Sequence, residues 1–180
     1  LTKKDINIVW FKRVLRFVDH EPLFMAHQEE IPILLVYFFE PSVMNYDDSD
    51  VRHWRFIYES IQEMQQKLNS ISAKIYFFHN EVQAVFEELL KVYNIKTVFS
   101  HQEIGNKITF DRDCDMKSFF DVNKIEWKES QMHGVIRGLK SRKDWDKRWE
   151  NVMRDFPKMI EIKDLNIESL DIHFYNQLKE

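Results

Sequence analysis

Short apolar runs alternate along the chain with longer amphipathic segments. The runs are rich in β-branched and aromatic side chains, which favours β-strands, and they cover residues 6–11, 33–39, 74–78, 97–99 and 125–127. The run at 33–39 is almost continuously hydrophobic, as is typical of a strand buried on both faces of a parallel sheet.

Between these runs, apolar side chains spaced by three or four residues predict helices over 51–71, 82–93 and 145–156. Strands that alternate with helices predict right-handed βαβ crossovers. We therefore expect an α/β fold: a Rossmann-like, doubly wound parallel sheet of about five strands, with helices on both faces in three α/β/α layers. Trp54 and Trp149 fall within the helical patterns, so we expect both to pack in the core.

The pattern changes after Phe156. Apolar residues then recur at intervals of two or three between residues 160 and 172, a period typical of neither a strand nor a helix. We interpret residues 1–156 as one α/β domain and residues 157–180 as the start of an interdomain connector. Two alternatives stay open for this segment: it packs against a further domain, or it folds back over its own sheet.

Composition limits the function classes. The 180 residues are 44% hydrophobic and carry a net charge of -4, so the chain lacks the basic footprint of a nucleic-acid-binding protein and is expected to hold DNA poorly by itself. The single Cys114 excludes an internal disulfide and a cysteine zinc site. No apolar run approaches the roughly 20 residues that span a bilayer, and no signal-peptide pattern is present. We expect a cytoplasmic chain without a membrane partner.

The common motifs of doubly wound sheets are absent. The first strand is followed by Lys12-Arg13-Val14-Leu15-Arg16, where a dinucleotide-binding loop needs glycines. The sequence has no phosphate-binding loop and no nucleophile elbow, and no histidine spacing supports a metal site. These absences argue against NAD enzymes, nucleotide triphosphatases and serine hydrolases.

Ligands of such sheets bind at the carboxyl ends of the strands, and charged residues gather there. Lys12, Arg13 and Arg16 follow the first strand, Glu40 ends the second, and Glu103 follows the fourth. The cations either recognise an anionic ligand or form ion pairs with acids such as Asp19, Glu40 and Asp113. Each glutamate is either an acceptor for a polar ligand ring or else a solvated acid or a salt-bridge partner, and spacing alone favours the two roles that involve no ligand.

Several segments together resemble motifs of the photolyase/cryptochrome family. In chain order they are Trp10–Leu23, Phe39-Glu40-Pro41, Arg52–Phe56, Ser100–Gly105, Thr109, Arg112-Asp113, Trp127–Glu129 and Gly134–Gly138. The resemblance covers about residues 6 to 150, and the motifs follow one another along the chain in the same order as in the family. The chain departs from the family at Val14, where an acid is usual, so an ion pair or cap normally made there is not expected.

This resemblance implies an amino-terminal domain that shares an antenna chromophore (a folate, a deazaflavin or a flavin) with a larger helical domain. In the family the helical domain binds FAD, contains the catalytic residues and receives damaged DNA, and it would lie beyond residue 180. The resemblance thus implies a deoxyribodipyrimidine photo-lyase or a cryptochrome photoreceptor for the whole protein. For this chain alone it implies no catalytic residue, no bound FAD and weak or no antenna binding.

The matching positions imply a set of antenna contacts, with Glu103 against the pterin ring of a folate. The set is Lys12, Arg13, Phe39, Glu40, Arg52 and Glu103. Two other functions remain as alternatives. One is a free-standing nucleotide- or small-molecule-binding module of Rossmann-like fold, and the other is a regulatory domain without a ligand.

Overall fold

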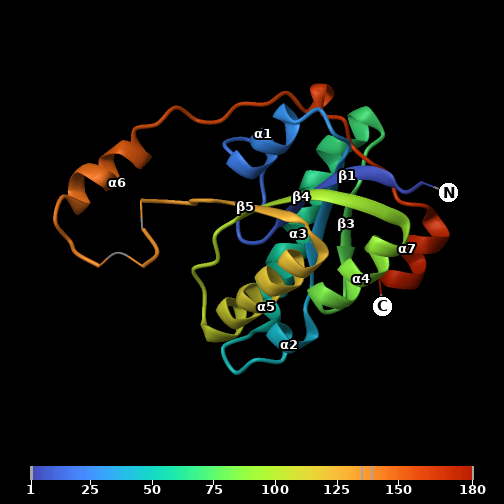
Figure 1. Cartoon of the computed structure of the whole chain (residues 1–180), viewed down its shortest axis with the longest axis horizontal. Helices are drawn as coiled ribbons and strands as arrows, with labels where there is room; N and C mark the ends of the chain where they lie inside the picture. Colours follow the sequence, from blue (N-terminus) through green and yellow to red (C-terminus); the bar gives the residue numbers. More distant parts are fainter. Residues whose placement is uncertain (1, 135, 139, 180) are drawn as a thin grey trace.

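Five parallel strands form one sheet in the order β3-β2-β1-β4-β5 (Figure 1). The strands are β1 (Lys4–Phe11), β2 (Ile33–Phe38), β3 (Ile75–Phe78), β4 (Tyr93–His101) and β5 (Glu126–Ser130). The strand order reverses at β1, because β2 pairs on one side of it and β4 on the other. The sheet is therefore doubly wound, which confirms the predicted fold class.

The computed structural model describes residues 2–134, 136–138 and 140–179. Val135, which belongs to the Gly134–Gly138 motif, lies outside the described residues. The helices are α1 (Glu21–Gln28), α2 (Pro41–Met44), α3 (Val51–Leu68), α4 (Val82–Val92), α5 (Lys107–Asn123), α6 (Trp145–Met153) and α7 (Ile172–Leu178), with single 3₁₀ turns at Asn69–Ile71 and Ile162–Asp164.

Side chains of alternate residues in each strand face two separate cores. In β1, Ile6, Ile8 and Trp10 pack with residues of α4, α5 and α7. Val9 and Phe11 face the opposite layer, which contains residues of α1 and α3. This alternation follows from the two-residue period of a strand, and it produces the expected three layers.

Side-chain caps fix where the two long helices begin. The Asp50 carboxylate accepts a hydrogen bond from the Arg52 backbone N–H at 2.8 Å at the start of α3. The Asn106 side chain accepts one from the Thr109 N–H at the start of α5. Such caps satisfy helix N–H groups that have no partner within the helix. They also place the first turns of α3 and α5 at the carboxyl edge of the sheet, beside the ends of β1 and β2.

The segment after Phe156 is folded back over the sheet. Ile33 and Ile167 form a parallel bridge, and the Leu170 N–H donates to the Tyr76 hydroxyl at 2.9 Å. The side chains of Leu165, Leu170 and Leu178 are buried in the two cores. The structure therefore shows the alternative in which this segment folds back over its own sheet.

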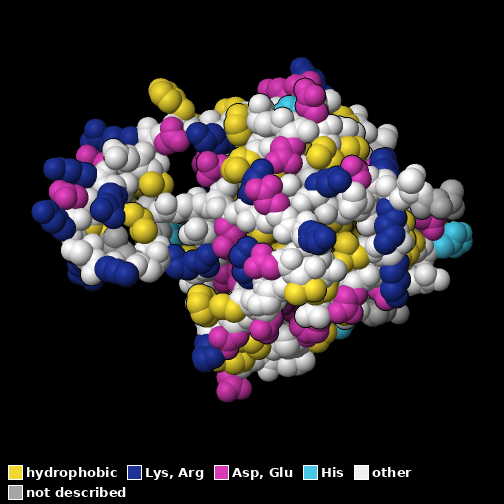
Figure 2. All heavy atoms as spheres, viewed as in Figure 1, with side chains coloured by type: hydrophobic (Ala, Val, Ile, Leu, Met, Phe, Trp, Pro, Cys, Tyr) yellow, Lys and Arg dark blue, Asp and Glu magenta, His cyan; other side chains and the backbone are white. Residues whose placement is uncertain are grey.

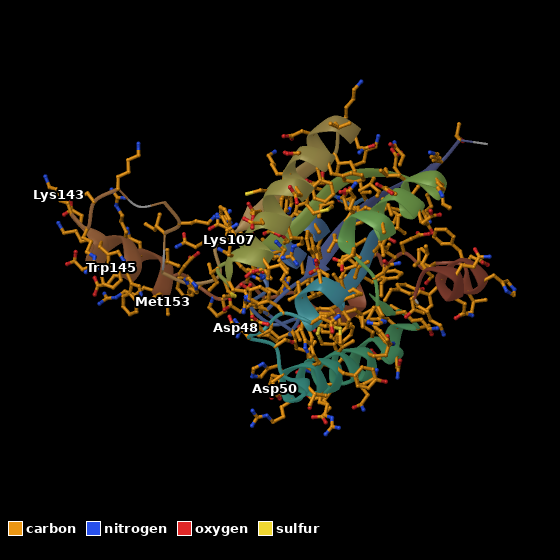
Figure 3. The ribbon with its side chains drawn as sticks, turned by 90° about the horizontal axis from the view of Figure 1, so that it is seen from below. Asp48, Asp50, Lys107, Lys143, Trp145 and Met153 are labelled. Atoms are coloured by element: carbon orange, nitrogen blue, oxygen red, sulfur yellow. The ribbon has the colours of Figure 1, made fainter. Side chains whose placement is uncertain are left out.

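Residues 131–158, which we call the arm, leave the body after β5 and carry α6 (Figures 1 and 3). Every residue of α6 is exposed, and Trp149 remains 41% exposed. The expectation that Trp149 packs in the core is therefore wrong: its indole lies against the backbone of Gly134 within the arm. Trp54 is half-buried against Phe39. Within the described ranges, no helix is long and apolar enough to cross a membrane.

Candidate functional site

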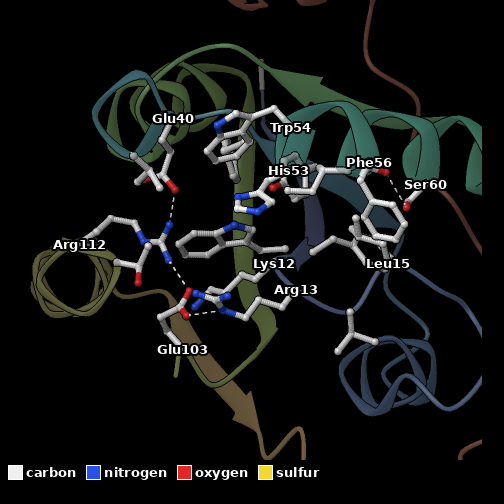
Figure 4. Close-up of a pocket in the computed structure, with 18 of the residues that line it drawn as sticks. Lys12, Arg13, Leu15, Glu40, His53, Trp54, Phe56, Ser60, Glu103 and Arg112 are labelled. Atoms are coloured by element: carbon white, nitrogen blue, oxygen red, sulfur yellow. Dashed lines mark hydrogen bonds and ion pairs between the residues drawn. The ribbon is translucent and has the colours of Figure 1, made fainter. Parts of the chain in front are cut away.

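A cavity of about 600 Å³ opens at the carboxyl ends of β1 and β2 (Figure 4). Its walls come from β1 and the following loop, from the end of β2, and from α2, α3 and α5. Trp10 and Tyr37 contribute aromatic surface to it, together with Trp54 and the 70%-exposed Phe56 of α3. Aromatic walls with a few polar groups are typical of small-molecule sites.

Arg112 of α5 joins three carboxylates along one wall of the cavity, and Figure 4 shows its contacts with Glu40 and Glu103. Its guanidinium contacts Glu40, reaches Glu103 with an N–O distance of 3.2 Å, and reaches Asp113 at 2.9 Å. The side chain is mostly buried and also stacks 4.8 Å from the centre of the Trp10 ring. The acids hold the pKa of Arg112 above its usual value although burial opposes them. Arg112 therefore remains a cation in this wall.

Lys12 is a second buried cation. Its ammonium lies 2.7 Å from Asp113 and 4.3 Å from the centre of the Trp10 ring. Burial lowers the pKa of Lys12, and the charge of Asp113 only partly offsets that effect. Because one carboxylate already neutralises it, Lys12 has little charge left to offer a ligand.

Glu103 is surrounded by donors. One of its oxygens accepts from Arg13 at 2.8 Å and from the backbone N–H groups of Ile104 and Gly105, and the other faces Arg112. Burial alone would raise the pKa of Glu103, but Arg13, Arg112 and these bonds bring it below its usual value. The carboxylate is thus ionised and has three hydrogen bonds on a single oxygen.

Glu40 differs from Glu103 because one of its oxygens is free. Oε1 contacts Arg112, whereas Oε2 is buried and has no hydrogen-bond partner among the residues that the structure describes. Burial raises the pKa of Glu40 to about 7 in spite of Arg112. A buried polar atom without a partner is costly, so Oε2 would gain free energy from a hydrogen-bond partner that reaches it.

The structure brings together four of the six residues that the sequence implied for the site. Lys12, Arg13, Glu40 and Glu103 line the cavity. Phe39 is not among the residues that line it, since its ring packs against Tyr37, Phe77 and Trp54. Arg52 does not line it either: its side chain is 82% exposed and pairs with Asp50.

Arg112 is the main residue that the candidate set missed. The pair Arg112-Asp113 was visible in the sequence as part of the family motif, but no helix was predicted around it. Ion pairing, one of the two alternatives for the basic loop, is present: Lys12 pairs with Asp113 and Arg16 with Asp19. In the described part of the chain, no cluster of three His, Cys, Asp or Glu side chains could hold a metal ion.

Two histidines lie at the carboxyl end of β4, outside this cavity. His20 is fully buried, and its Nδ1 accepts the Leu23 N–H at the start of α1. The His101 ring stands edge-on to it, with 4.6 Å between the ring centres. Burial, followed by the charges of Arg16 and Lys12, lowers the pKa of His101 to about 4. Burial also lowers the pKa of His20 well below its usual value, so both rings are neutral at pH 7.

Comparisons with known proteins point to one family. Residues 7–159 match the family model described as DNA photolyase. A cryptochrome DASH of Synechocystis sp. is 28% identical over 102 residues, which are 54% of this chain and 21% of that protein. The blue-light photoreceptor PHR2 of Arabidopsis thaliana is 29% identical over 104 residues, 55% of this chain and 23% of that protein. The chain thus matches less than a quarter of the length of these relatives.

Solved structures share the fold over nearly the whole chain. The cryptochrome of Synechocystis sp. superposes with a TM-score of 0.69 at 18% identity, covering 93% of this chain and 38% of that one. An archaeal photolyase from Sulfolobus tokodaii, described with two FAD molecules and a novel light-harvesting cofactor, gives 0.71 at 17% identity, covering 97% and 42%.

Proposed function

Because this chain belongs to the DNA photolyase family, we propose that it is the antenna-binding α/β domain of a photolyase or cryptochrome. We further propose that the cavity beside Glu40 receives the planar ring of the antenna. In a longer protein, light absorbed there would be passed to FAD in a helical domain, for repair of damaged DNA or for signalling. The division at residue 156 and the cytoplasmic location remain predictions.

The observation that carries this proposal is that Glu40 lines an aromatic cavity and its buried Oε2 has no hydrogen-bond partner among the described residues. Flavin, deazaflavin and pterin rings each present a ring N–H that can donate to a carboxylate. Glu103 is the weaker candidate for this role, since its oxygens already accept from Arg13, Arg112 and two backbone N–H groups.

The charges along the cavity point to recognition of a ring rather than of a phosphate tail. Lys12, Arg13 and Arg112 are matched by three acids, Asp113, Glu103 and Glu40. An anionic tail would have to displace one of these pairs, so we propose that such a tail lies outside, beyond the exposed Phe56.

Calorimetric titration of the 180-residue chain tests the proposal, with riboflavin, FMN and a reduced folate as ligands. We expect weak, saturable binding of a ring compound. FMN should bind within about threefold of riboflavin, because the cations that line the cavity, Arg16 with Asp19 included, are already in ion pairs. At pH 8, above the Glu40 pKa of about 7, Glu40→Gln should weaken binding about tenfold, as expected when a charged hydrogen bond of about 1.5 kcal/mol is lost. The exposed Glu63→Gln is the control.

No saturable binding of any of the three ligands would contradict the proposal. That result would favour a regulatory domain without a ligand. The ion pairs of the cavity wall are consistent with that alternative too, because its charged side chains neutralise one another. Equal affinity of the wild type and Glu40→Gln would remove Glu40 from the site.

A further inference from the structure

We propose that Lys12 and Arg112 keep Trp10 from donating an electron to a light-excited ring in the cavity. This inference rests on the proposed function, because an antenna has to stay excited until its energy is passed on. Electron transfer from a nearby indole competes with that step, since indole is among the side chains that are oxidised most easily. The two cations therefore act on the lifetime of the excited ring rather than on its binding.

Trp10 belongs to a stacked pair of indoles at the wall of the cavity. Its ring lines the cavity and stacks on the ring of Trp127, with 6.0 Å between the ring centres and 17° between the planes. Two stacked rings share the positive charge that oxidation leaves, so a pair loses an electron more easily than a single indole. In the absence of nearby charges, this pair would be a better electron donor than Trp54, the other indole that lines the cavity.

Two cations lie over the pair. The Lys12 ammonium is 4.3 Å from the centre of the Trp10 ring and 4.9 Å from the centre of the Trp127 ring. The Arg112 guanidinium is 4.8 Å from the centre of the Trp10 ring. A cation is attracted to the electron-rich face of a neutral indole, but it repels the radical cation that forms when the indole is oxidised. Both cations thus oppose the loss of an electron from Trp10.

Burial strengthens this repulsion. Most of the described lysines and arginines are exposed to water, and Figure 2 shows many of them on one face of the molecule. The side chains of Lys12 and Arg112, by contrast, are only 4% and 14% exposed, so solvent screens them little from the rings. Trp54 has no cation over its ring among the described residues. The protection is therefore specific to the pair that contains Trp10.

Asp113 determines what the loss of Lys12 does to the pair. Its carboxylate lies 2.7 Å from the ammonium and cancels much of that charge at longer range. In Lys12→Met the repulsion is lost while the carboxylate remains, and its negative charge stabilises an indole radical cation. Both changes make Trp10 easier to oxidise. Arg112 still pairs with Asp113 at 2.9 Å, so the carboxylate keeps a partner and the variant should fold.

The suppressed step moves one electron and no atoms. The Trp10 indole loses the electron and becomes a radical cation, and the excited ring gains it. Recombination in the dark returns the electron to Trp10. No outside reductant is consumed, and the only loss is the light energy that the ring had absorbed.

The fluorescence lifetime of a flavin attached in the cavity tests the inference. Cys114→Ser removes the only cysteine, and His53→Cys adds a thiol at an exposed position that lines the cavity. A maleimide derivative of riboflavin is then coupled to this thiol. Adding Lys12→Met should shorten the lifetime about threefold or more, because the repulsion of a desolvated cation is lost. Lys12→Arg keeps the charge and should leave the lifetime close to that of the parent protein.

Further substitutions separate electron transfer from a change of structure. Adding Trp10→Phe to Lys12→Met should restore the lifetime, because the electron donor is gone. Trp54→Phe is the matched control in the same variant and should restore nothing. With Lys12 intact, Trp10→Phe should leave the lifetime unchanged. Circular dichroism verifies that each variant is folded.

An unchanged lifetime in Lys12→Met would overturn the inference, as would a shortened lifetime that Trp10→Phe does not restore. A longer lifetime in Trp10→Phe with Lys12 intact would also overturn it, since Trp10 would then already donate electrons. This last comparison does not depend on the folding of a Lys12 variant. Because the flavin is attached covalently, these results do not depend on affinity. Failure of free riboflavin to bind would contradict the proposed function and leave this test in force.

Discussion

Glu40 and His101 are buried titratable side chains near the carboxyl edge of the sheet. Their shifted pKa values make the stability of the fold depend on pH, in opposite directions for the two residues. Burial raises the pKa of Glu40 to about 7 and lowers that of His101 to about 4. In both cases the folded state disfavours the charged form. The contributions of Glu40 and His101 to stability change over nearly the same pH range. Each contribution is therefore best measured by comparing the wild type with a variant that lacks that titratable side chain.

Glu40→Gln isolates the effect of the carboxyl group. Folded Glu40 holds a proton up to about pH 7, whereas the unfolded chain releases it near pH 4.5. The wild type therefore loses stability relative to Glu40→Gln as pH rises from 4.5 to 7, by up to about 3 kcal/mol. Urea unfolding of both proteins at several pH values measures this difference. A constant difference across the range would contradict it.

His101→Gln isolates the effect of the imidazole. The unfolded chain takes up a proton near pH 6.5, but folded His101 resists protonation until about pH 4. The wild type should therefore lose up to about 3 kcal/mol relative to His101→Gln as pH falls from 6.5 to 4. Exposed His79→Gln is the control and should follow the wild type. Parallel stability curves for wild type and His101→Gln would refute the effect.

At the scale of elements, α5 supplies the buried cation that holds the cavity wall together. Arg112 contacts carboxylates that come from the end of β2, from the loop after β4 and from α5 itself. Removing one member of a buried network leaves the others without compensation. The position of α5 and the charge state of the cavity are therefore coupled.

Arg112→Met should destabilise the fold by about 3 to 5 kcal/mol. The exposed Lys117→Met on the same helix, which loses a surface ion pair, should cost less than about 1 kcal/mol. Denaturant unfolding at pH 8 compares them. Adding Glu40→Gln to Arg112→Met should restore part of the loss, because it removes one uncompensated charge. If the second substitution restored nothing, the two side chains would not be coupled.

Much of the fold could be predicted from apolar periodicity, but the helix α5 could not. The buried face of α5 includes Thr109 and Asp113 beside Met116 and Phe120. A helix whose buried side contains the polar residues of a site lacks the apolar stripe that identifies it in a sequence. The same polar residues make the site, so the helix and its Arg112 were missed together.

Periodicity also says nothing about what covers an apolar stripe. Trp145, Trp149 and Val152 have regular helical spacing, and α6 does form there, yet it belongs to the arm and not to the core. Phe39 illustrates a related limit. Phe38 lines the cavity, but the next residue does not, because the Phe39 ring packs against Tyr37, Phe77 and Trp54.

At the scale of the whole molecule, the chain divides into a body and an arm that differ in their access to proteases. Brief trypsin treatment should cut first within residues 140–154, where every residue that the structure describes is exposed. The two fragments should stay together on gel filtration, because residues 165–178 bury Leu165, Leu170 and Leu178 against the sheet. Separation without denaturant would mean that this docking is weak.

The placement of the five tryptophans gives the protein two groups of intrinsic fluorophores. Trp10, Trp54 and Trp127 lie in or beside the cavity, with the rings of Trp10 and Trp127 stacked 6.0 Å apart. Trp145 and Trp149 stack on the arm. A light-absorbing ring in the cavity would quench the first group by energy transfer, and replacing the arm pair with Phe would leave an emission spectrum that comes from the cavity alone.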